Sequence, residues 1–324
     1  RPSDNEAINP LESLEYGTRF SEPVAAPRYK TEVLPYGQVA SGANIALGDI
    51  DGDLEQELIT GAGPGGGPHI RTFELDGTPI TSFFAYDEGF RGGVDVAAGD
   101  TNGDGIDEII VGAGPGGGPH IRVLTADGAE ISNFFAYAQT FRGGIRVDAG
   151  DLDGDGIDEI VSGAGPGGGP HVQAFTQDGT PQANFMAFDP NFRNGIDVAV
   201  IDADETREAR IAAAAGPGGG PHVRVFDTAG NPTAGFFAFG ESFRGGTRIN
   251  HMTVGSSNRL LVAPASGGGA HVRQFYMDSV PSDDNQSTFE TWWRGGYDIA
   301  GGTDIARISS AQGNRRTTVR RINF

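Results

Sequence analysis

The sequence predicts an all-β fold in which one antiparallel unit is repeated around a ring. Three markers recur at a nearly constant spacing. A glycine turn, GPGGGPH, ends in histidines that stand 51 residues apart, and a degraded copy precedes a fifth histidine 49 residues later. An FRGG-type turn and an aromatic segment, FFAY at residues 83–86, keep the same step. Short β-prone runs between such turns indicate the four-stranded blades of a β-propeller.

One unit accounts for four strands. In the second repeat we expect them at residues 94–98, 108–112, 120–124 and 131–137. An acidic loop joins the first two strands, GPGGGP joins the next two, and an Ala-Asp-Gly turn closes the last hairpin. The small residues beside the first two strands suit crowding near a central axis.

Counting the units gives six blades. First strands begin near residues 43, 94, 145, 196, 247 and 297. The last unit lacks its fourth strand, whereas residues 30–36 form a spare one at the start of the chain. We therefore predict a propeller over residues 30–324, closed by pairing of strand 30–36 with the C-terminal blade, which removes an open edge. Residues 1–29, polar and containing four prolines, are expected to form an arm outside the repeat.

Composition limits the function. The net charge is −20, with 43 acidic and 23 basic residues, which argues against a nucleic-acid partner. Cysteine is absent, so there is no disulfide framework. No apolar run is long enough to span a membrane. The first residue is Arg1 and not Met, which is compatible with a removed leader and an extracellular or cell-surface location.

The acidic loops have the spacing of Ca²⁺ ligands. Such a cation takes six to eight oxygens from a sharply bent loop. Positions 1, 3 and 5 offer side-chain oxygens, position 7 a carbonyl and position 9 a carboxylate. The candidates are Asp49, Asp51, Asp53, Glu55 and Glu57; Asp100, Asn102, Asp104, Ile106 and Glu108; and Asp151, Asp153, Asp155, Ile157 and Glu159.

About three Ca²⁺ ions are therefore expected. Loop one has Leu54 where the others have glycine, so its bend should be strained. The loop after Asp202 has lost ligands and is expected to be free of metal. Asp107 and Asp158, at position 8, compete with the following glutamates as the last ligand. The alternative is that these loops are only solvated acidic turns.

The run GDTNGDGIDEIIVGAG at residues 99–114 resembles the FG-GAP or VCBS repeat of calcium-binding propellers, of which the integrin α-chain head is a relative. This resemblance implies a calcium-stabilised propeller used in adhesion, in carbohydrate binding or as a non-catalytic module. Integrin-type heads have seven blades, so seven blades are the alternative to the six counted here.

A possible ligand face lies at the end of the blades opposite the acidic loops, where GPGGGPH and FRGG meet. Its histidines and arginines are His69, Arg91, His120, Arg142, His171, Arg193, His222, Arg244, His271 and Arg294. The arginines could hold anionic groups of an acidic glycan. In the structural alternative, each histidine hydrogen-bonds its glycine turn and each arginine stacks on an aromatic ring.

Catalytic motifs are missing from the sequence. The formal G-x-G-x-x-G in the glycine turn precedes a β-prone run and opens no helix, so it does not predict a nucleotide site. We predict a non-enzymatic binding or adhesion module whose ligand is a glycan or a surface protein. The alternatives are a subunit of a fibre or surface layer that self-assembles through the arm, and a polysaccharide-active enzyme with a carboxylate pair in the propeller mouth.

Overall fold

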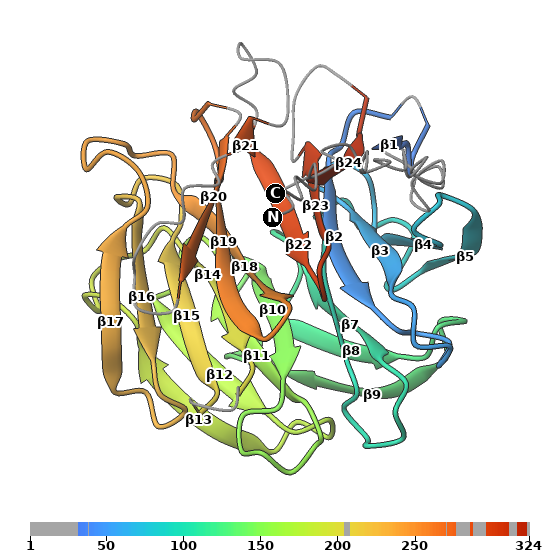
Figure 1. Cartoon of the computed structure of the whole chain (residues 1–324), viewed down its shortest axis with the longest axis horizontal. Coiled ribbons are helices and arrows are strands. Elements are labelled where there is room, and N and C mark those ends of the chain that lie inside the picture. The colour runs from blue at the N-terminus through green and yellow to red at the C-terminus, as the bar shows by residue number, and fades with distance from the viewer. Residues whose placement is uncertain are drawn as a thin grey trace, which may run out of the picture.

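The computed structural model describes residues 32–37, 39–203, 208–269, 271–276, 286–287, 296–310 and 316–322. In these residues the regular structure is β, arranged as six four-stranded antiparallel sheets around a central axis (Figure 1). The predicted six-bladed propeller is confirmed, and the alternative of seven blades is wrong. These ranges contain no helix that is long and apolar enough to cross a membrane.

Each of the first five blades is a simple meander in chain order. Blade one consists of β2 (Ala43–Gly48), β3 (Glu57–Ala62), β4 (His69–Phe73) and β5 (Pro79–Phe84). Blade two consists of β6 (Val94–Gly99), β7 (Glu108–Ala113), β8 (His120–Leu124) and β9 (Glu130–Phe135). Blade three consists of β10 (Ile145–Gly150), β11 (Glu159–Ala164), β12 (His171–Phe175) and β13 (Pro181–Met186). Blade four consists of β14 (Ile196–Ile201), β15 (Arg210–Ala215), β16 (His222–Phe226) and β17 (Pro232–Phe237). Blade five consists of β18 (Thr247–Val254), β19 (Ser257–Pro264), β20 (His271–Tyr276) and β21 (Gln286–Ser287).

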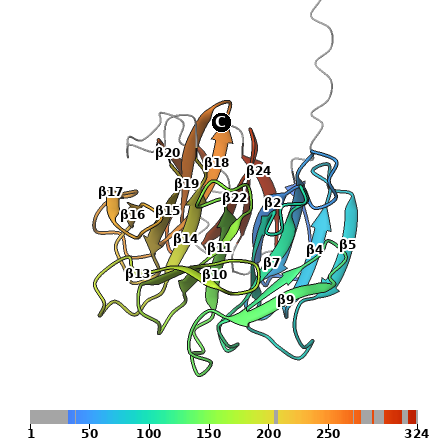
Figure 2. The same cartoon turned by 90° about the horizontal axis from the view of Figure 1, so that it is seen from below.

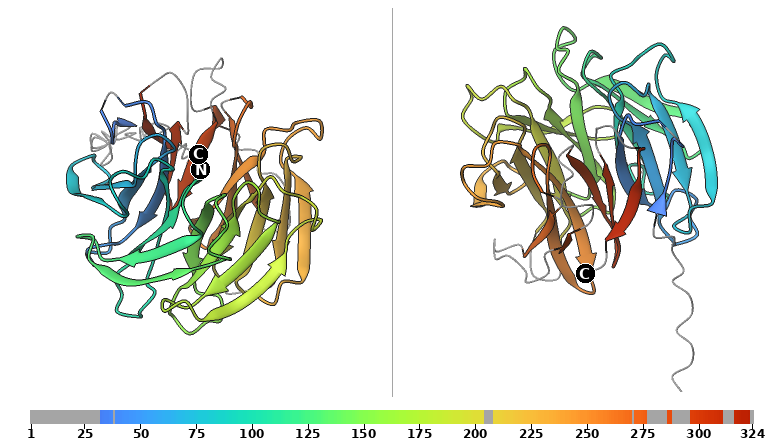
Figure 3. Two further views of the ribbon diagram at one scale, coloured as in Figure 1. Left: turned by 180° about the vertical axis from the view of Figure 1, so that it is seen from behind. Right: turned by 90° about the horizontal axis from the view of Figure 1, so that it is seen from above.

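The last blade is assembled from both ends of the chain. It contains β22 (Tyr297–Gly301), β23 (Ala306–Ser310) and β24 (Val319–Ile322), and its outer strand is β1 (Glu32–Val33). Glu32 pairs with Arg320 and Val33 with Val319. Within the described part of the predicted strand 30–36, only two residues are in the ladder. The red C-terminal strands accordingly lie beside the blue N-terminal ones in Figure 3.

The first strand of each blade contacts the first strand of the next, and β22 contacts β2, so the ring is closed. Figure 2 shows the same ring turned by 90°, with β9 and β13 at the outside of their blades. Burial follows this order. The first two strands of blade one are buried throughout, whereas β5 is exposed at alternate positions.

Between neighbouring blades the apolar side chains form the core, in one cluster for each interface. The cluster between blades three and four, for example, joins Val161 and Val172 to Val198 and Ile211. The cluster between blades six and one contains Val33, Ile45 and Val319, with Tyr36 packed against it. Because each cluster belongs to two sheets, no blade has a core of its own, as is typical of repeat folds.

The GPGGGPH turn and the FRGG turn pack against each other at one end of the ring, and this contact accounts for both motifs. The Gly116 amide donates to the Arg142 carbonyl oxygen at 2.8 Å, so the FRGG turn docks on the glycine turn. A Cβ atom on Gly92 would lie 2.2 Å from the Pro115 oxygen, and one on Gly114 would lie 2.2 Å from the Gly92 oxygen. Only glycine therefore fits at these two positions.

Candidate functional site

The acidic loops adopt the same conformation in the first three blades. In loop one, Asp49 Oδ1 accepts the Gly52 amide at 2.7 Å and Oδ2 accepts the Leu54 amide at 2.8 Å. Asp100 and Asp151 make the corresponding bonds in loops two and three. A carboxylate oxygen has lone pairs beyond the one that takes the N–H bond, so each aspartate still has capacity for a cation.

Two of the three loops bring carboxylates together. Ligand atoms of Asp49, Asp51 and Asp53 lie within 4.8 Å of one another, and so do those of Asp151, Asp153 and Glu159. Asp53, Asp104 and Asp155 each accept the amide two residues further on, from Glu55, Ile106 and Ile157. In loop two, Asn102 donates its amide to Glu108, which closes that loop on itself. Leu54 has a φ of 72°, the left-handed region that Gly105 and Gly156 occupy in the other loops.

The glutamate at position 9 folds back beneath its own loop. Oε2 of Glu57, Glu108 and Glu159 accepts the position 2 amide at 2.9, 2.9 and 3.0 Å. Glu57 is fully buried, and its Oε1 has no hydrogen-bond partner in the described structure. Burial, together with the charges of Asp51, Glu74 and Asp49, raises the pKa of Glu57 to about 8. A buried carboxylate of this kind requires either a proton or a cation.

The aspartate at position 8 has a different use, which the sequence left undecided. Asp107 Oδ2 accepts the Asp49 amide at 2.9 Å, and the Asp107 amide donates to the Asp49 carbonyl oxygen at 2.8 Å. Asp158 makes the same two contacts with Asp100. Each loop is therefore fixed to the loop of the preceding blade. Position 9, and not position 8, is left to face its own loop.

The fourth loop departs from the pattern. Asp204 lies outside the described residues. Asp202 lies beside β10 and β18. Its Oδ1 lies 2.6 Å from where a Cβ of Gly150 would stand, and its Oδ2 lies 3.5 Å from His251 Nδ1. Asp202 thus occupies a place on the channel wall like that of Asp107 beside Gly48 and Asp158 beside Gly99.

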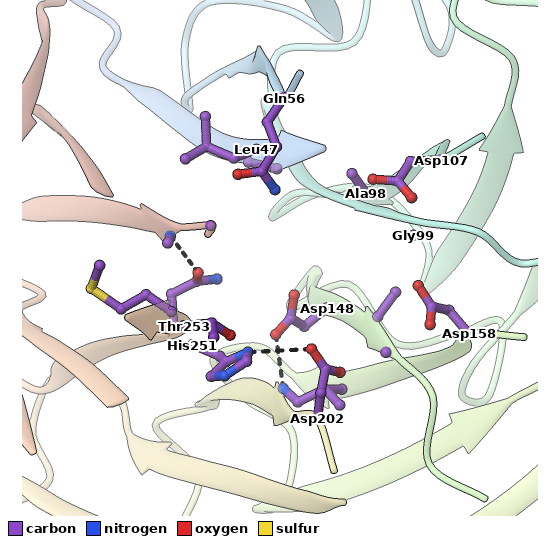
Figure 4. A pocket seen from close by; sticks show the side chains of 18 of the residues that line it. Leu47, Gln56, Ala98, Gly99, Asp107, Asp148, Asp158, Asp202, His251 and Thr253 are labelled. Atoms are coloured by element: carbon purple, nitrogen blue, oxygen red, sulfur yellow. Dashed lines mark hydrogen bonds and ion pairs between the residues drawn. The ribbon is translucent and has the colours of Figure 1, made fainter. Parts of the chain in front are cut away.

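These aspartates line a cavity of about 250 Å³ at the acidic end of the central channel (Figure 4). Asp107, Asp148, Asp158 and Asp202 come from three blades, and His251 and Thr253 from a fourth. Burial raises the pKa of Asp107 to about 6, of Asp158 to about 7 and of Asp148 to about 8. Protons or cations are therefore favoured at this end of the channel.

Stability is expected to fall as the pH rises through this range. Folded Asp148 holds a proton up to about pH 8, whereas the unfolded carboxyl releases it near pH 4. Between these values folding takes up a proton, so Asp148 lowers the free energy of unfolding by up to about 1.4 kcal/mol per pH unit. Asp148→Asn, whose oxygen can still accept the Val200 amide, should raise the melting temperature at pH 8 and flatten the profile. An unchanged slope between pH 5 and 8 in thermal melts would contradict this.

A charged ring crosses the channel near its other end, and sequence reasoning missed it. The second position of each first strand holds, in blade order, Asn44, Asp95, Arg146, Asp197, Arg248 and Asp298. Arg146 pairs with Asp95, and Arg248 Nη1 lies 3.0 Å from Asp197 Oδ1. The three aspartates also accept the Val147, Ile249 and Ile45 amides of the next blade at 2.8–2.9 Å.

The predicted ligand face contains more internal contacts than expected. His69, His120 and His171 do not bond the glycine turn. Their Nε2 atoms lie 2.8, 3.1 and 2.6 Å from Ser82, Asn133 and Asn184 on the fourth strand. Nη1 of Arg91, Arg142, Arg193 and Arg244 donates to two carbonyl oxygens of its own turn, although the side chains remain exposed. His222 and His271 start β16 and β20, and Arg294 lies outside the described residues.

No protein-family model matches the chain. Among solved structures, a protein of unknown function from Bacteroides caccae has a TM-score of 0.51 at 16% identity, over 81% of this chain and 85% of that one. The β-propeller domain of Myceliophteria thermophila Cps50 (Swd1) has a TM-score of 0.45 at 8% identity, over 89% and 99%. A rhamnogalacturonan lyase of Bacillus licheniformis has a TM-score of 0.42 at 17% identity, over 91% and 68%. At identities of 8–17%, these likenesses assign no function to the chain.

Proposed function

We propose that the chain is an extracellular binding or adhesion module whose propeller is stabilised by Ca²⁺ in the acidic loops. One observation carries the calcium part of this proposal. Glu57 is fully buried with an unpartnered oxygen, beneath a loop where Asp49, Asp51 and Asp53 lie within 4.8 Å of one another. Its counterpart in loop three, Glu159, is itself within such a group. Oxygen ligands at this density suit Ca²⁺.

The FG-GAP or VCBS likeness belongs to this proposal and rests on the loop residues. The contact between each position 8 aspartate and the loop of the preceding blade supports the calcium proposal. Because Asp107 and Asp158 hold the first ligands of loops one and two, a bound ion would stiffen two neighbouring blades. In this proposal calcium has a structural role, and the ligand, a glycan or a surface protein, binds elsewhere on the ring.

Calorimetric titration of the chelator-treated protein should show about three Ca²⁺ ions per chain. Melting temperature should rise with calcium, because each site contributes about 2.7 kcal/mol at a hundredfold excess over Kd. Asp153→Asn removes one carboxylate of loop three and should lower the stoichiometry by one. Asp127→Asn, in an exposed hairpin turn of blade two, is the matched control and should leave it unchanged. Identical melting curves in calcium and in chelator would contradict the proposal.

The ligand side of the proposal is tested by a glycan array read with and without calcium. Beside the histidines the fourth strands expose Phe84, Phe135, Met186 and Phe237, each more than 40% accessible. Apolar side chains of this kind favour binding surfaces when they recur. Saturable binding that chelator weakens would support a calcium-dependent glycan module. Assembly of the purified chain into filaments, without glycan binding, would instead support the alternative of a structural subunit.

A polysaccharide-active enzyme is the second candidate, and the channel cavity is the observation that favours it. Asp148 and Asp158 combine raised pKa values with a cavity open at one end of the ring. A protonated and an ionised carboxyl together are what glycoside hydrolysis requires. Turnover of a polysaccharide by the native chain, lost in Asp148→Asn while the fold persists, would establish this function in place of the first.

A further inference from the structure

Blade three differs from its neighbours in a side chain that bridges to the preceding blade. In blades one, two, four and five this side chain, two residues after the histidine, is an arginine whose Nη1 donates to a carbonyl oxygen 35–37 residues earlier. The pairs are Arg71 with Pro35, Arg122 with Ala85, Arg224 with Ala187 and Arg273 with Ala238. In blade three, Gln173 Nε2 donates to the Ala136 oxygen at 2.7 Å. The shorter amide keeps this bond but supplies no guanidinium.

In blade two the guanidinium of Arg122 lies in a site with aromatic walls formed by Tyr86, His120 and Phe90, called the aromatic seat below. The Cζ atom of Arg122 lies 5.2 Å from the ring centroid of Tyr86. His120 lies 5.6 Å from the same ring and Phe90 6.3 Å from it, at 72°. The Tyr86 hydroxyl is fixed against the Val111 and His120 carbonyl oxygens at 2.9 and 2.8 Å. A cation at this distance from an aromatic face is held by the ring quadrupole.

Blade three has the same seat without the arginine. Tyr137 is fixed by its hydroxyl against the Ser162 and His171 carbonyl oxygens at 3.0 and 2.7 Å. His171 lies 5.3 Å from the Tyr137 ring, and Phe141 lies 6.2 Å from it at 75°. Asn184 holds the His171 ring in place at 2.6 Å. The aromatic walls are therefore pre-organised for an occupant that this blade does not provide.

The vacant seat is a cavity of about 320 Å³, lined by Tyr137, Phe141, Gly168, Gly169, His171 and Gln173. At its rim, Met186 Sδ lies 3.8 Å from where a Cβ of Gly169 would stand, the same distance as that of Phe237 from the corresponding point at Gly220 in blade four. The lining residues include no lysine or arginine, although Nη1 of Arg193 lies 3.9 Å from where a Cβ of Gly169 would stand.

We propose that this cavity binds the guanidinium of an arginine side chain from a basic partner segment. The ligand class follows from blade two, where the same aromatic walls hold the guanidinium of Arg122, which Glu130 also pairs at 3.0 Å. In blades one and four the arginine lies over Phe73 or Phe226 instead. The net charge of −20 attracts basic segments to the molecule as a whole. The site does not depend on the acidic loops, so calcium and this ligand can be tested separately.

The test is amide chemical-shift mapping of the ¹⁵N-labelled full chain with a blocked Gly-Arg-Gly tripeptide. The neutral isostere, with citrulline in place of arginine, is the matched probe. Shifts at Gly168, Gly169 and His171 are expected, with the arginine probe binding about 2- to 30-fold more tightly, the range a cation–π contact provides. Equal affinities, or arginine-induced shifts spread over the acidic loops alone, would overturn the proposal.

Two variants make the test specific. Gln173→Arg places in blade three the residue that four other blades carry at this position, and it should abolish the shifts. Ala229→Arg adds the same charge on an exposed turn of blade four and should preserve them. Conversely, Arg122→Gln should open the corresponding seat in blade two, with new shifts at Gly117 and Gly118. Persistence of the blade three shifts in Gln173→Arg would refute the site.

Discussion

Replacing Tyr36 with alanine is expected to lower the free energy of unfolding by about 2–4 kcal/mol, because the change leaves a cavity in the core. Tyr36 packs on the cluster between blades six and one, and its hydroxyl lies 3.0 and 2.9 Å from the Thr60 and His69 carbonyl oxygens. It anchors β1, which is only two residues long. Urea unfolding followed by circular dichroism measures the loss.

Deleting residues 1–36 should have a larger effect, because it also removes Val33 and exposes the edge of β24. An uncovered strand edge is a template for pairing with another chain. We expect aggregates in size-exclusion chromatography, or a chain that fails to fold. Recovery of a monomer with the native unfolding midpoint would show that closure through β1 is dispensable.

Two matched controls separate ring closure from general damage. Tyr36→Phe keeps the aromatic side chain and removes only its hydroxyl group. Phenylalanine is found at the corresponding position in two later repeats, as Phe188 and Phe239. This change should cost about 1 kcal/mol, the typical net contribution of a hydrogen bond. Deleting residues 1–20 leaves β1 and Tyr36 intact and should be tolerated.

The sequence predicted the repeat, the strands and their order because glycine turns and β-prone runs are local signals. It also predicted the odd geometry of Leu54, since glycine occupies that position in loops two and three. The fourth strand ends earlier than the sequence predicts. Residues 131–137 were expected to be extended, but β9 ends at Phe135 and the Ala136 amide turns to the Pro119 carbonyl oxygen.

The contacts between blades could not be predicted from the sequence, because they join residues about 50 positions apart. Asp107 could not be distinguished from Glu108 as a ligand until its contact with Asp49 was known. The contacts of the histidines could not be predicted from the sequence either. Their partners Ser82, Asn133 and Asn184 lie on the neighbouring fourth strand, at a position where the residue differs between repeats.

The charged ring did leave a signal in the sequence from which it could have been predicted. A charged or amide side chain recurs at the second position of every first strand, and in five of the six strands its neighbours are apolar or aromatic. Each one alone resembles an isolated polar residue in a strand. Only the closed ring brings Asp95, Arg146, Asp197, Arg248 and Asp298 together, and carboxylates then alternate with guanidinium groups across the channel.

Asp197→Ala is therefore expected to lower the free energy of unfolding by about 3–5 kcal/mol, the usual cost of removing one partner of a buried ion pair. Asp197 lies between two arginines, with Arg248 Nη1 at 3.0 Å and Arg146 Nε at 3.9 Å, and it also accepts the Ile249 amide at 2.8 Å. Burial raises the pKa of Asp197, and the two arginines oppose that rise. The variant loses both the ion pairs and the bond to blade five.

Asp197→Asn retains an oxygen for the Ile249 amide but no charge, so its cost should be intermediate. Asp127→Ala, in an exposed turn of blade two, is the control and should change stability by less than about 1 kcal/mol. The measurement is urea unfolding at pH 7 in saturating calcium, so that the acidic loops contribute equally to every variant. If Asp197→Ala unfolds at the same urea concentration as the control, the alternating charges do not hold the blades together.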